Sequence, residues 1–168
     1  MLIITGSMGA GKTSVLAEAS DILALQQIVH AAIDLDALGL AYLPFADGND
    51  DVMYRNLESV CRNYAALGVT RLLVARALEN RAELELCRST VSPQCIAICR
   101  LTASIGEMQR RVKKRESGIL QREYVDRVAR LDAILECARL EDFVVVNQNR
   151  SVNEAAKEML LKAGWIQD

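Results

Sequence analysis

The stretch GSMGAGKT (6–13), which directly follows the apolar run LIIT (2–5), decides how the rest of the chain is interpreted. It matches the pattern G-x-x-x-x-G-K-[ST] at every fixed position. Glycines let such a backbone curl until successive N–H groups point into one concavity, and the positive end of the following helix faces the same anion. The stretch therefore predicts a strand, a phosphate-binding loop and a helix in that order.

Each residue of this loop has an expected role. Lys12 is expected to reach the β- and γ-phosphates of a nucleotide, and the Thr13 hydroxyl is expected to bind Mg²⁺. Ser14 is suited either to the nucleotide or to a plain position in the first helical turn. The residues expected to contact the nucleotide are Gly6, Ser7, Met8, Gly9, Ala10, Gly11, Lys12, Thr13 and Ser14.

Length and composition restrict the class of protein. The chain has 168 residues, of which 51% are hydrophobic and 25% charged, and we expect one globular domain over 1–168. A net charge of −2 argues against a nucleic-acid partner, because such proteins usually carry a strong basic excess. No apolar run approaches the roughly 20 residues that a membrane span needs. We expect no membrane partner and a cytoplasmic location.

The cysteines predict neither disulfides nor a zinc site. The chain has an odd number, five, with no C-x-x-C pair, and it has a single histidine, His30. A zinc site needs more convergent ligands than these. Reduced cysteines in a cytosolic protein are the favoured interpretation, and the residues concerned are Cys61, Cys87, Cys95, Cys99 and Cys137.

Short apolar runs alternate with longer stretches of helical spacing. The runs are apolar at nearly every position, which is typical of parallel strands covered on both faces, and they lie at 2–5, 29–34, 71–75, 95–101 and 143–147. Helical spacing covers 15–23, 53–67, 124–138 and 152–163. Capping-box spacing marks helix starts at Ser104 with Glu107 and at Ser151 with Glu154. The alternation favours an α/β doubly wound domain.

Two segments interrupt this alternation. Segment 38–51 contains Pro44 and a Gly-Asn pair and is predicted to be a long functional loop on the substrate side. Segment 110–123 gathers basic residues around Gly118, which is consistent with a lid at about 112–123 between two helices. Both segments are equally consistent with plain solvated connections.

The residues after the second and third strands indicate how the nucleotide is used. No N-K-x-D motif for guanine is present, and the third strand is followed by Arg76 where many ATPases place an acid. Asp34 and Asp36 end the second strand, and their alternate spacing directs both carboxylates to one side. One carboxylate can hold Mg²⁺ while the other accepts a proton from a hydroxyl. The alternative is an acidic loop start or helix cap.

This combination resembles small P-loop kinases of the adenylate-kinase-like group. The D-x-D after the second strand, together with the missing acid on the third, is similar to shikimate kinase, gluconate kinase, adenylylsulfate kinase and chloramphenicol phosphotransferase. The stretches from IDLDALG to NRSV and AGW also resemble bacterial P-loop kinases of unassigned substrate. The resemblance implies a three-layer P-loop NTPase fold. Its five-stranded parallel sheet would have the order 2-3-1-4-5, with a helical lid.

The resemblance also implies roles for individual residues. Asp34 would lie near Mg²⁺ with Thr13, and Asp36 would contact the acceptor hydroxyl and act as base. In EMQRRVKKR (107–115), Arg111 would stack on adenine or touch phosphate, and Arg115 would close on the transferring phosphoryl group. A solvated basic helix face is the alternative for either arginine, and Arg122 and Arg127 are weaker candidates.

Further expectations concern the base and the acceptor. The loop after the last strand resembles the family's adenine-side loop, where Asn147, Arg150, Ser151 and Val152 would line the base, with helix capping as the alternative for Ser151. The chain departs from shikimate kinase in lacking its glycine triplet after the third strand and its R-P-L-L lid motif. In place of the triplet, Arg76 is a possible anchor for an anionic or polar substrate. Acceptor contacts are expected from Tyr42, Phe45, Asp47 and Asn49.

Together these features predict an ATP- and Mg²⁺-dependent transfer of the γ-phosphate to a hydroxyl of a small molecule. Lys12, Asp36 and Arg115 are the expected catalytic residues, and Asp36 and Arg76 are expected to bind the acceptor. Two alternatives stay open: a regulatory nucleotide-binding protein that hydrolyses slowly, and a nucleoside or nucleotide kinase. The chain is expected to act as a monomer or homodimer.

Overall fold

The structure, a computed structural model, describes residues 1–41 and 49–167. One five-stranded parallel sheet has the order β2-β3-β1-β4-β5. Its strands are β1 (Leu2–Thr5), β2 (Ala31–Asp34), β3 (Leu72–Ala75), β4 (Ala97–Thr102) and β5 (Phe143–Val146). These are the five predicted strands in the predicted order, so the expected P-loop NTPase topology is confirmed.

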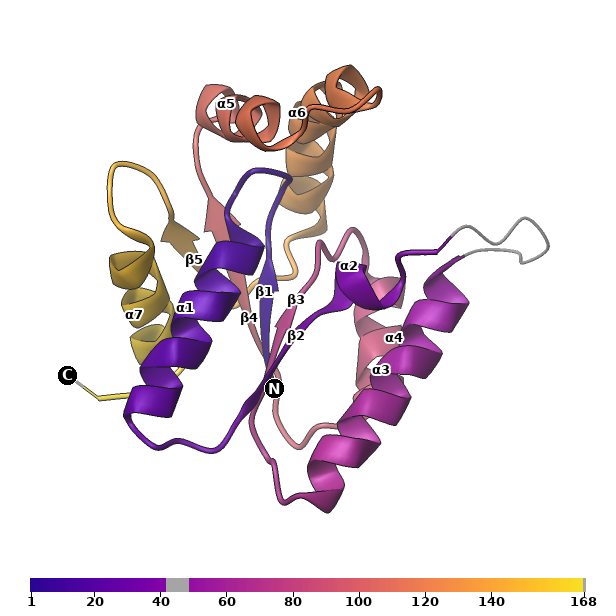
Figure 1. Cartoon of the computed structure of the whole chain (residues 1–168), viewed down its shortest axis with the longest axis vertical. Helices are drawn as coiled ribbons and strands as arrows, with labels where there is room; N and C mark the ends of the chain where they lie inside the picture. The colour runs from indigo at the N-terminus through magenta and orange to yellow at the C-terminus, as the bar shows by residue number, and fades with distance from the viewer. Residues whose placement is uncertain (42–48, 168) are drawn as a thin grey trace.

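Helices form layers on both faces of the sheet (Figure 1). Helices α1 (Lys12–Leu25) and α7 (Val152–Lys162) pack together on one face, and α3 (Asn49–Ala66) and α4 (Arg81–Val91) pack together on the other. The short α2 (Leu35–Leu38) directly follows β2. A hairpin of α5 (Ile105–Arg115) and α6 (Gln121–Ala138) extends over the carboxyl end of the sheet.

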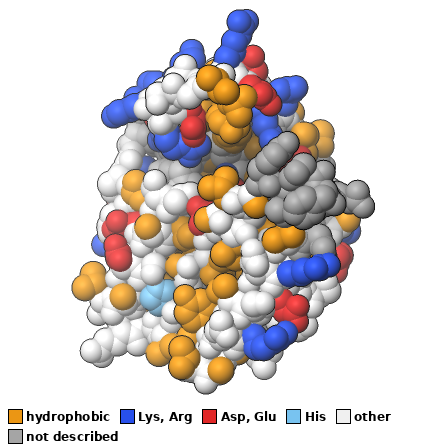
Figure 2. All heavy atoms as spheres, turned by 45° about the vertical axis from the view of Figure 1, so that its right-hand side comes forward, with side chains coloured by type: hydrophobic (Ala, Val, Ile, Leu, Met, Phe, Trp, Pro, Cys, Tyr) orange, Lys and Arg blue, Asp and Glu red, His pale blue; other side chains and the backbone are white. Residues whose placement is uncertain are grey.

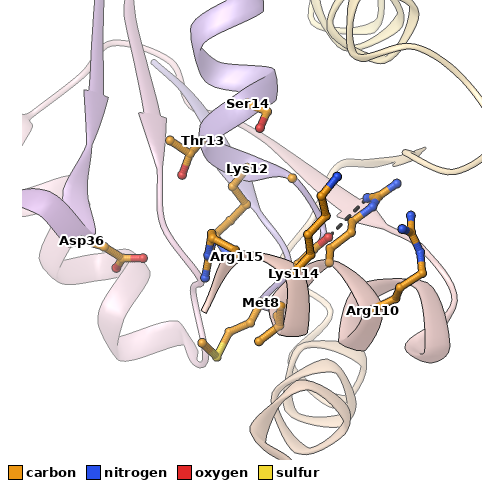
Figure 3. Close-up of a pocket in the computed structure, with 12 residues that line it drawn as sticks. Met8, Lys12, Thr13, Ser14, Asp36, Arg110, Lys114 and Arg115 are labelled. Atoms are coloured by element: carbon orange, nitrogen blue, oxygen red, sulfur yellow. Dashed lines mark hydrogen bonds between the residues drawn. The ribbon is translucent and has the colours of Figure 1, made fainter. Parts of the chain in front are cut away.

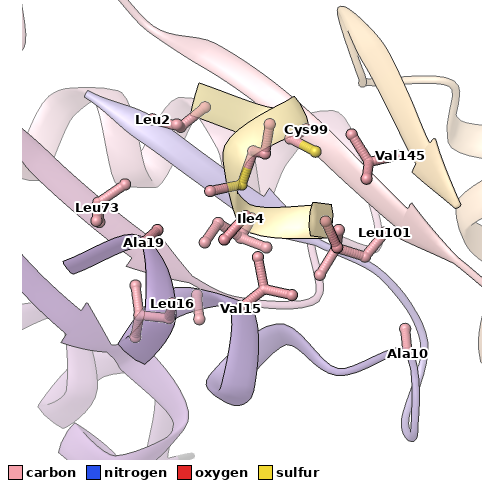
Figure 4. Packing of buried hydrophobic residues seen from close by; sticks show 14 of the residues in the cluster. Leu2, Ile4, Ala10, Val15, Leu16, Ala19, Leu73, Cys99, Leu101 and Val145 are labelled. Atoms are coloured by element: carbon pink, nitrogen blue, oxygen red, sulfur yellow. The ribbon is translucent and has the colours of Figure 1, made fainter. Parts of the chain in front are cut away.

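The sheet divides the core into two apolar clusters. Successive side chains of a strand point to opposite faces, so Leu2 and Ile4 of β1 pack toward α1 and α7, whereas Ile3 packs toward α3 and α4. In Figure 4, Val15 and Ala19 of α1 lie in the first cluster together with Ile4 of β1 and Leu101 of β4. This two-sided burial explains why the central strands are apolar at nearly every position.

The edge strand β5 differs from the prediction. Its run FVVV suggested burial on both faces, but Val144 and Val146 are 40% and 53% exposed while Val145 is fully buried. The reason is position, because β5 is an outer strand of the sheet and the α1–α7 layer covers only the face that carries Val145.

The two predicted capping boxes have different outcomes. At Ser151 the box is complete, since its hydroxyl accepts from the Glu154 N–H and the Glu154 carboxylate accepts from the Ser151 N–H. At Ser104 the prediction is wrong for the second hydrogen bond of the capping box, the one from the Ser104 N–H to the Glu107 carboxylate. Ser104 caps the Glu107 N–H, but its own N–H is donated to Gln148, because the Glu107 carboxylate binds arginines instead.

The segment predicted as a lid, at about 112–123, contains parts of two helices and their connection. The first part of segment 112–123 continues α5 up to Arg115, and α6 begins at Gln121, so only the residues between these two helices form the connection. The basic residues before Arg115 therefore belong to helix α5 and not to a loop. Among the described residues, no helix is both long and apolar enough to cross a bilayer.

The central layer should dominate stability. Leu101→Ala removes a fully buried side chain from β4 and should lower the free energy of unfolding by about 3 kcal/mol. Leu25→Ala makes the same change at an 86% exposed position and should cost less than about 0.5 kcal/mol. Urea denaturation of both variants measures the difference, and equal losses would contradict the core described above.

Candidate active site

The glycine-rich loop between β1 and α1 has a backbone that other residues could not adopt at two positions. Gly9 and Gly11 have φ angles of +78° and +100°. A Cβ atom at Gly9 would lie 2.3 Å from the Met108 carbonyl oxygen, and one at Gly11 would lie 2.3 Å from the Asn147 side-chain amide. The loop therefore needs glycine for both its conformation and its close packing against α5 and the end of β5.

Lys12, the first residue of α1, folds back over this loop. Its ammonium donates to the carbonyl oxygens of Gly6 at 3.0 Å and Ser7 at 3.3 Å. Burial lowers the pKa of Lys12, and the nearby carboxylates of Asp36 and Asp34 partly oppose that shift. Lys12, which is predicted to bind phosphate, is thus held at the glycine-rich loop near Asp34 and Asp36.

Thr13 and Asp34 form the predicted pair of metal ligands. The Thr13 hydroxyl donates to the Asp34 carboxylate at 2.7 Å, across the ends of α1 and β2. Asp34 occupies the N-cap position of α2, but its side chain makes no capping hydrogen bond, which weakens the helix-cap alternative. A hydroxyl and a carboxylate oxygen this close match the oxygen ligands that Mg²⁺ prefers, so the residues fit this ion.

Asp36 belongs to a chain of ion pairs that the sequence did not predict, although Asp36 and Arg76 were both expected to bind the acceptor. Its Oδ1 accepts from Arg76 at 2.6 Å, and the Arg76 Nε donates to Glu83 at 2.8 Å. The other Glu83 oxygen accepts the Glu79 N–H. Arg76, predicted as a substrate anchor, is therefore held by two carboxylates. Glu83 was missed, although the Asn80 to Glu83 spacing that starts α4 is visible in the sequence.

Helix α5 contributes a basic face. Arg110 and Lys114, and likewise Arg111 and Arg115, are four residues apart, and all four line the same cavity as the loop. The first pair was not singled out from the sequence, although its helical spacing could have revealed it. Figure 2 shows Lys and Arg side chains gathered at the end of the molecule that carries α5 and α6.

Arg111 fastens α5 to the glycine-rich loop. Its guanidinium donates to the Gly9 carbonyl at 3.3 Å, to the Asn147 carbonyl at 2.8 Å and to Glu107 at 2.8 Å. Each of these contacts is with the protein itself, so Arg111 joins three segments that are far apart in the chain. Arg111 also lines the cavity beside the loop, and contact with a nucleotide stays a prediction.

The predicted adenine-side residues have structural partners. Asn147 is buried, and its side-chain amide donates to the Ala10 carbonyl at 2.8 Å. Arg150 pairs with Glu158 of α7, and Val152 begins that helix. Arg150 and Val152 do not line the cavity beside the glycine-rich loop. Contacts of these residues with a base therefore stay predictions.

Many of the predicted site residues line one cavity of about 560 Å³, although Asp34 and Asn147 are not among its lining residues. In Figure 3, Lys12, Thr13 and Ser14 lie at the start of α1, Asp36 lies on one side, and Arg110 and Lys114 approach from α5 on the other. The lining residues are Met8, Gly9, Gly11, Lys12, Thr13, Ser14, Asp36, Arg110, Arg111, Val112, Lys114 and Arg115. Cations outnumber acids in this lining, which suits a polyphosphate.

A second cavity of about 560 Å³ lies on the α3–α4 side. Arg76 lines it, so the Asp36–Arg76 ion pair separates the two cavities. The other lining residues are Tyr54, Glu79, Asn80, Ala82, Glu83, Leu86 and Arg127. Arg122 lines neither cavity. The predicted acceptor contacts Tyr42, Phe45 and Asp47, and the side chain of Asn49, lie outside what the structure describes.

Glu107 should make stability depend on acid pH. Hydrogen bonds from Arg110 and then Arg111 lower its pKa from 4.5 to about 2. Because the folded-state pKa is the lower one, its contribution is present above pH 4.5 and is lost as pH falls toward 2. Glu107→Gln should therefore be less stable than wild type at pH 6, with the gap shrinking on acidification. Urea denaturation across this range measures it, and a constant gap would contradict the pairing.

Comparison with known proteins supports the fold through structure rather than sequence. No protein-family model matches the chain, and no curated protein matches it. A sugar kinase from Janibacter sp. HTCC2649 is similar in structure, with a TM-score of 0.68, 17% identity, and 97% of this chain and 93% of that chain covered. The APS kinase of Mycobacterium tuberculosis has a TM-score of 0.66, 18% identity, and 97% and 96% coverage.

Shikimate kinase from Bacteroides thetaiotaomicron has a TM-score of 0.66 and 16% identity, with 97% of both chains covered. These similarities extend over nearly the whole of each chain, with the identity too low to carry more than the fold. These three solved structures are small-molecule kinases, and the chain has the fold of the P-loop kinases of the adenylate-kinase-like group.

Proposed function

We propose that the protein is an ATP- and Mg²⁺-dependent phosphotransferase that moves the γ-phosphate to a hydroxyl group of a small molecule. One observation carries this proposal. Asp36 lines the loop cavity together with Lys12 and Thr13, and its partner Arg76 lines the second cavity. A phosphate donor and an acceptor would thus meet at a carboxylate, which is the arrangement that transfer to a hydroxyl needs.

The donor side of the proposal rests on the loop and its lysine. The positive-φ glycines, the N-terminus of α1 and Lys12 together form a phosphate site. The structurally similar APS kinase was solved in complex with AMPPNP and APS, a pair of ligands that supports a two-cavity arrangement. Adenine would lie toward Arg111 and the loop of Asn147, Arg150 and Val152.

Mg²⁺ would be held by Thr13 and Asp34. The chemistry supplied there would be neutralisation of the negative charge on the nucleotide phosphates. The Thr13 hydroxyl and the Asp34 carboxylate already lie 2.7 Å apart at the end of β2. A hydroxyl and a carboxylate together favour a hard cation that prefers oxygen ligands.

The transfer itself would depend mainly on position and charge. The Asp36 Oδ1 is held by Arg76, and its Oδ2 accepts no hydrogen bond from the described residues, so Oδ2 is the atom that would receive the acceptor's proton. Lys12 would exchange the loop carbonyls for phosphate oxygens. Arg115, on the last turn of α5, would stabilise the charge of the transferring group as the α5–α6 hairpin closes and excludes water.

Two other functions share the same fold. A regulatory nucleotide-binding protein would bind and slowly hydrolyse ATP without an acceptor. A nucleoside or nucleotide kinase would require a base-sized acceptor. Release of ADP, measured across sugars, polyols, hydroxy acids, nucleosides and phenicol-like or aminoglycoside-like antibiotics, distinguishes the three. Turnover that depends on an acceptor supports the proposal. Turnover restricted to nucleosides or nucleotides supports a nucleoside or nucleotide kinase. Tight ATP binding without turnover on any acceptor supports a regulatory nucleotide-binding protein.

Asp36→Asn tests the proposed base. Loss of the proton acceptor should lower acceptor-dependent turnover at least about 100-fold, while nucleotide affinity stays nearly unchanged. Asp21→Asn, on the exposed side of α1, is the matched control and should keep full activity. Melting temperatures of both variants show whether each is folded. Full activity of folded Asp36→Asn would refute this role.

Gly9→Ala tests the phosphate-binding loop. The added methyl group would collide with the Met108 carbonyl and strain a positive φ, so nucleotide affinity should fall by about tenfold or more. Gly118→Ala, where an added Cβ atom would meet nothing within 4 Å, is the control. Fluorescent nucleotide titration measures both variants. Unchanged affinity in Gly9→Ala would place the nucleotide elsewhere.

A further inference from the structure

We propose that the acceptor is a polyhydroxyl compound without an anionic group, either uncharged or carrying an amine. This inference rests on the proposed function and assigns a substrate class to the second cavity. The evidence is the charge arrangement of that cavity, in which the guanidinium groups that could bind an anion are paired with carboxylates of the chain itself.

Arg76 is the first of these groups. It lies between Asp36 and Glu83, with N–O distances of 2.6 and 2.8 Å, and its side chain is only 20% exposed. Glu83 is itself fixed, because its second oxygen accepts the Glu79 N–H at 2.9 Å and its own N–H is capped by Asn80. An anionic acceptor at Arg76 would have to displace a held carboxylate, exchanging one ion pair for another without net gain.

Arg127 of α6 is the second group. It donates to Glu79 at 3.1 Å, and this contact links the α5–α6 hairpin to the segment after β3. Its side chain is 53% exposed, so this pair is weaker than that of Arg76. Glu79 nevertheless places a carboxylate where an acceptor's acid group would otherwise bind.

The remaining lining favours hydroxyl groups. Among the described residues of this cavity, two cations face three carboxylates when Asp36 at its boundary is included: Asp36, Glu79 and Glu83. Carboxylate oxygens accept hydrogen bonds from hydroxyl or ammonium groups, whereas a second anion would be repelled. Leu86 and Ala82 add apolar surface against which a carbon skeleton can pack.

Sulfate is a suitable probe because it tests for a free guanidinium without knowledge of the acceptor. The full chain is first saturated with Mg²⁺ and AMPPNP, which occupies the loop, and sulfate is then titrated while the Nε–H signals of Arg76 and Arg127 are followed by NMR. We expect no saturable change in either signal at millimolar sulfate. A saturable shift of Arg76 would overturn the proposal.

Glu79→Gln provides the positive control for this titration. Release of Arg127 should produce a several-fold gain in sulfate affinity, with the change confined to the Arg127 signal. Glu85→Gln, an exposed carboxylate of α4 that pairs with Arg88, should leave the titration as in wild type. Wild type that binds sulfate as tightly as Glu79→Gln would contradict the proposal, because Arg127 would then be free.

A matched set of acceptors completes the test. Glucose, glucosamine and glucuronate differ in one substituent, and a nucleoside and its monophosphate form a second pair. We expect ADP release with uncharged or amine-bearing members only, and turnover confined to glucuronate or the monophosphate would overturn the proposal. Nucleotide binding without turnover on any acceptor would count against the kinase function. The sulfate titration would then still show whether the second cavity binds an anion.

Discussion

Close backbone contact around the glycine-rich loop is the constraint on which the site depends. Gly9 lies against the Met108 carbonyl of α5, and Gly11 lies against the Asn147 amide after β5. Arg111 then binds the carbonyl oxygens of Gly9 and Asn147, so three distant segments meet at one loop. Because these contacts leave no room for a Cβ atom, the glycines determine both the shape of the predicted phosphate site and the position of the α5–α6 hairpin.

A second constraint lies at the other side of the loop cavity. Asp36 follows β2, Arg76 follows β3 and Glu83 lies in α4, yet hydrogen bonds join the three into one chain. The arrangement separates a cavity in which the described cations outnumber the acids from one in which the described acids and cations are equal in number. Charge thus distinguishes the two cavities, although both have a volume of about 560 Å³.

Much of this architecture could be predicted because local chemistry determines it. Apolar runs of strand length, separated by helical spacing, indicated the parallel sheet, and the loop motif indicated its phosphate site. The Ser151 cap could be predicted since both partners lie within one turn. The similar cap at Ser104 was only half right, because Arg110 and Arg111 compete for the Glu107 carboxylate. Competition of this kind is not visible in a four-residue pattern.

Although it missed the helices α2 and α4, the sequence by itself determined the five strands and most of the helices along the chain, the glycine-rich loop, and the acids Asp34 and Asp36 at and just beyond the end of β2. Each of these depends on residues that are neighbours in the chain or one helical turn apart. Only the tertiary structure decided that Arg76 is held between Asp36 and Glu83, that Asn147 braces the loop, and that Val144 is exposed at a sheet edge. These outcomes depend on which distant segments meet, and packing of the sheet and its helices determines that.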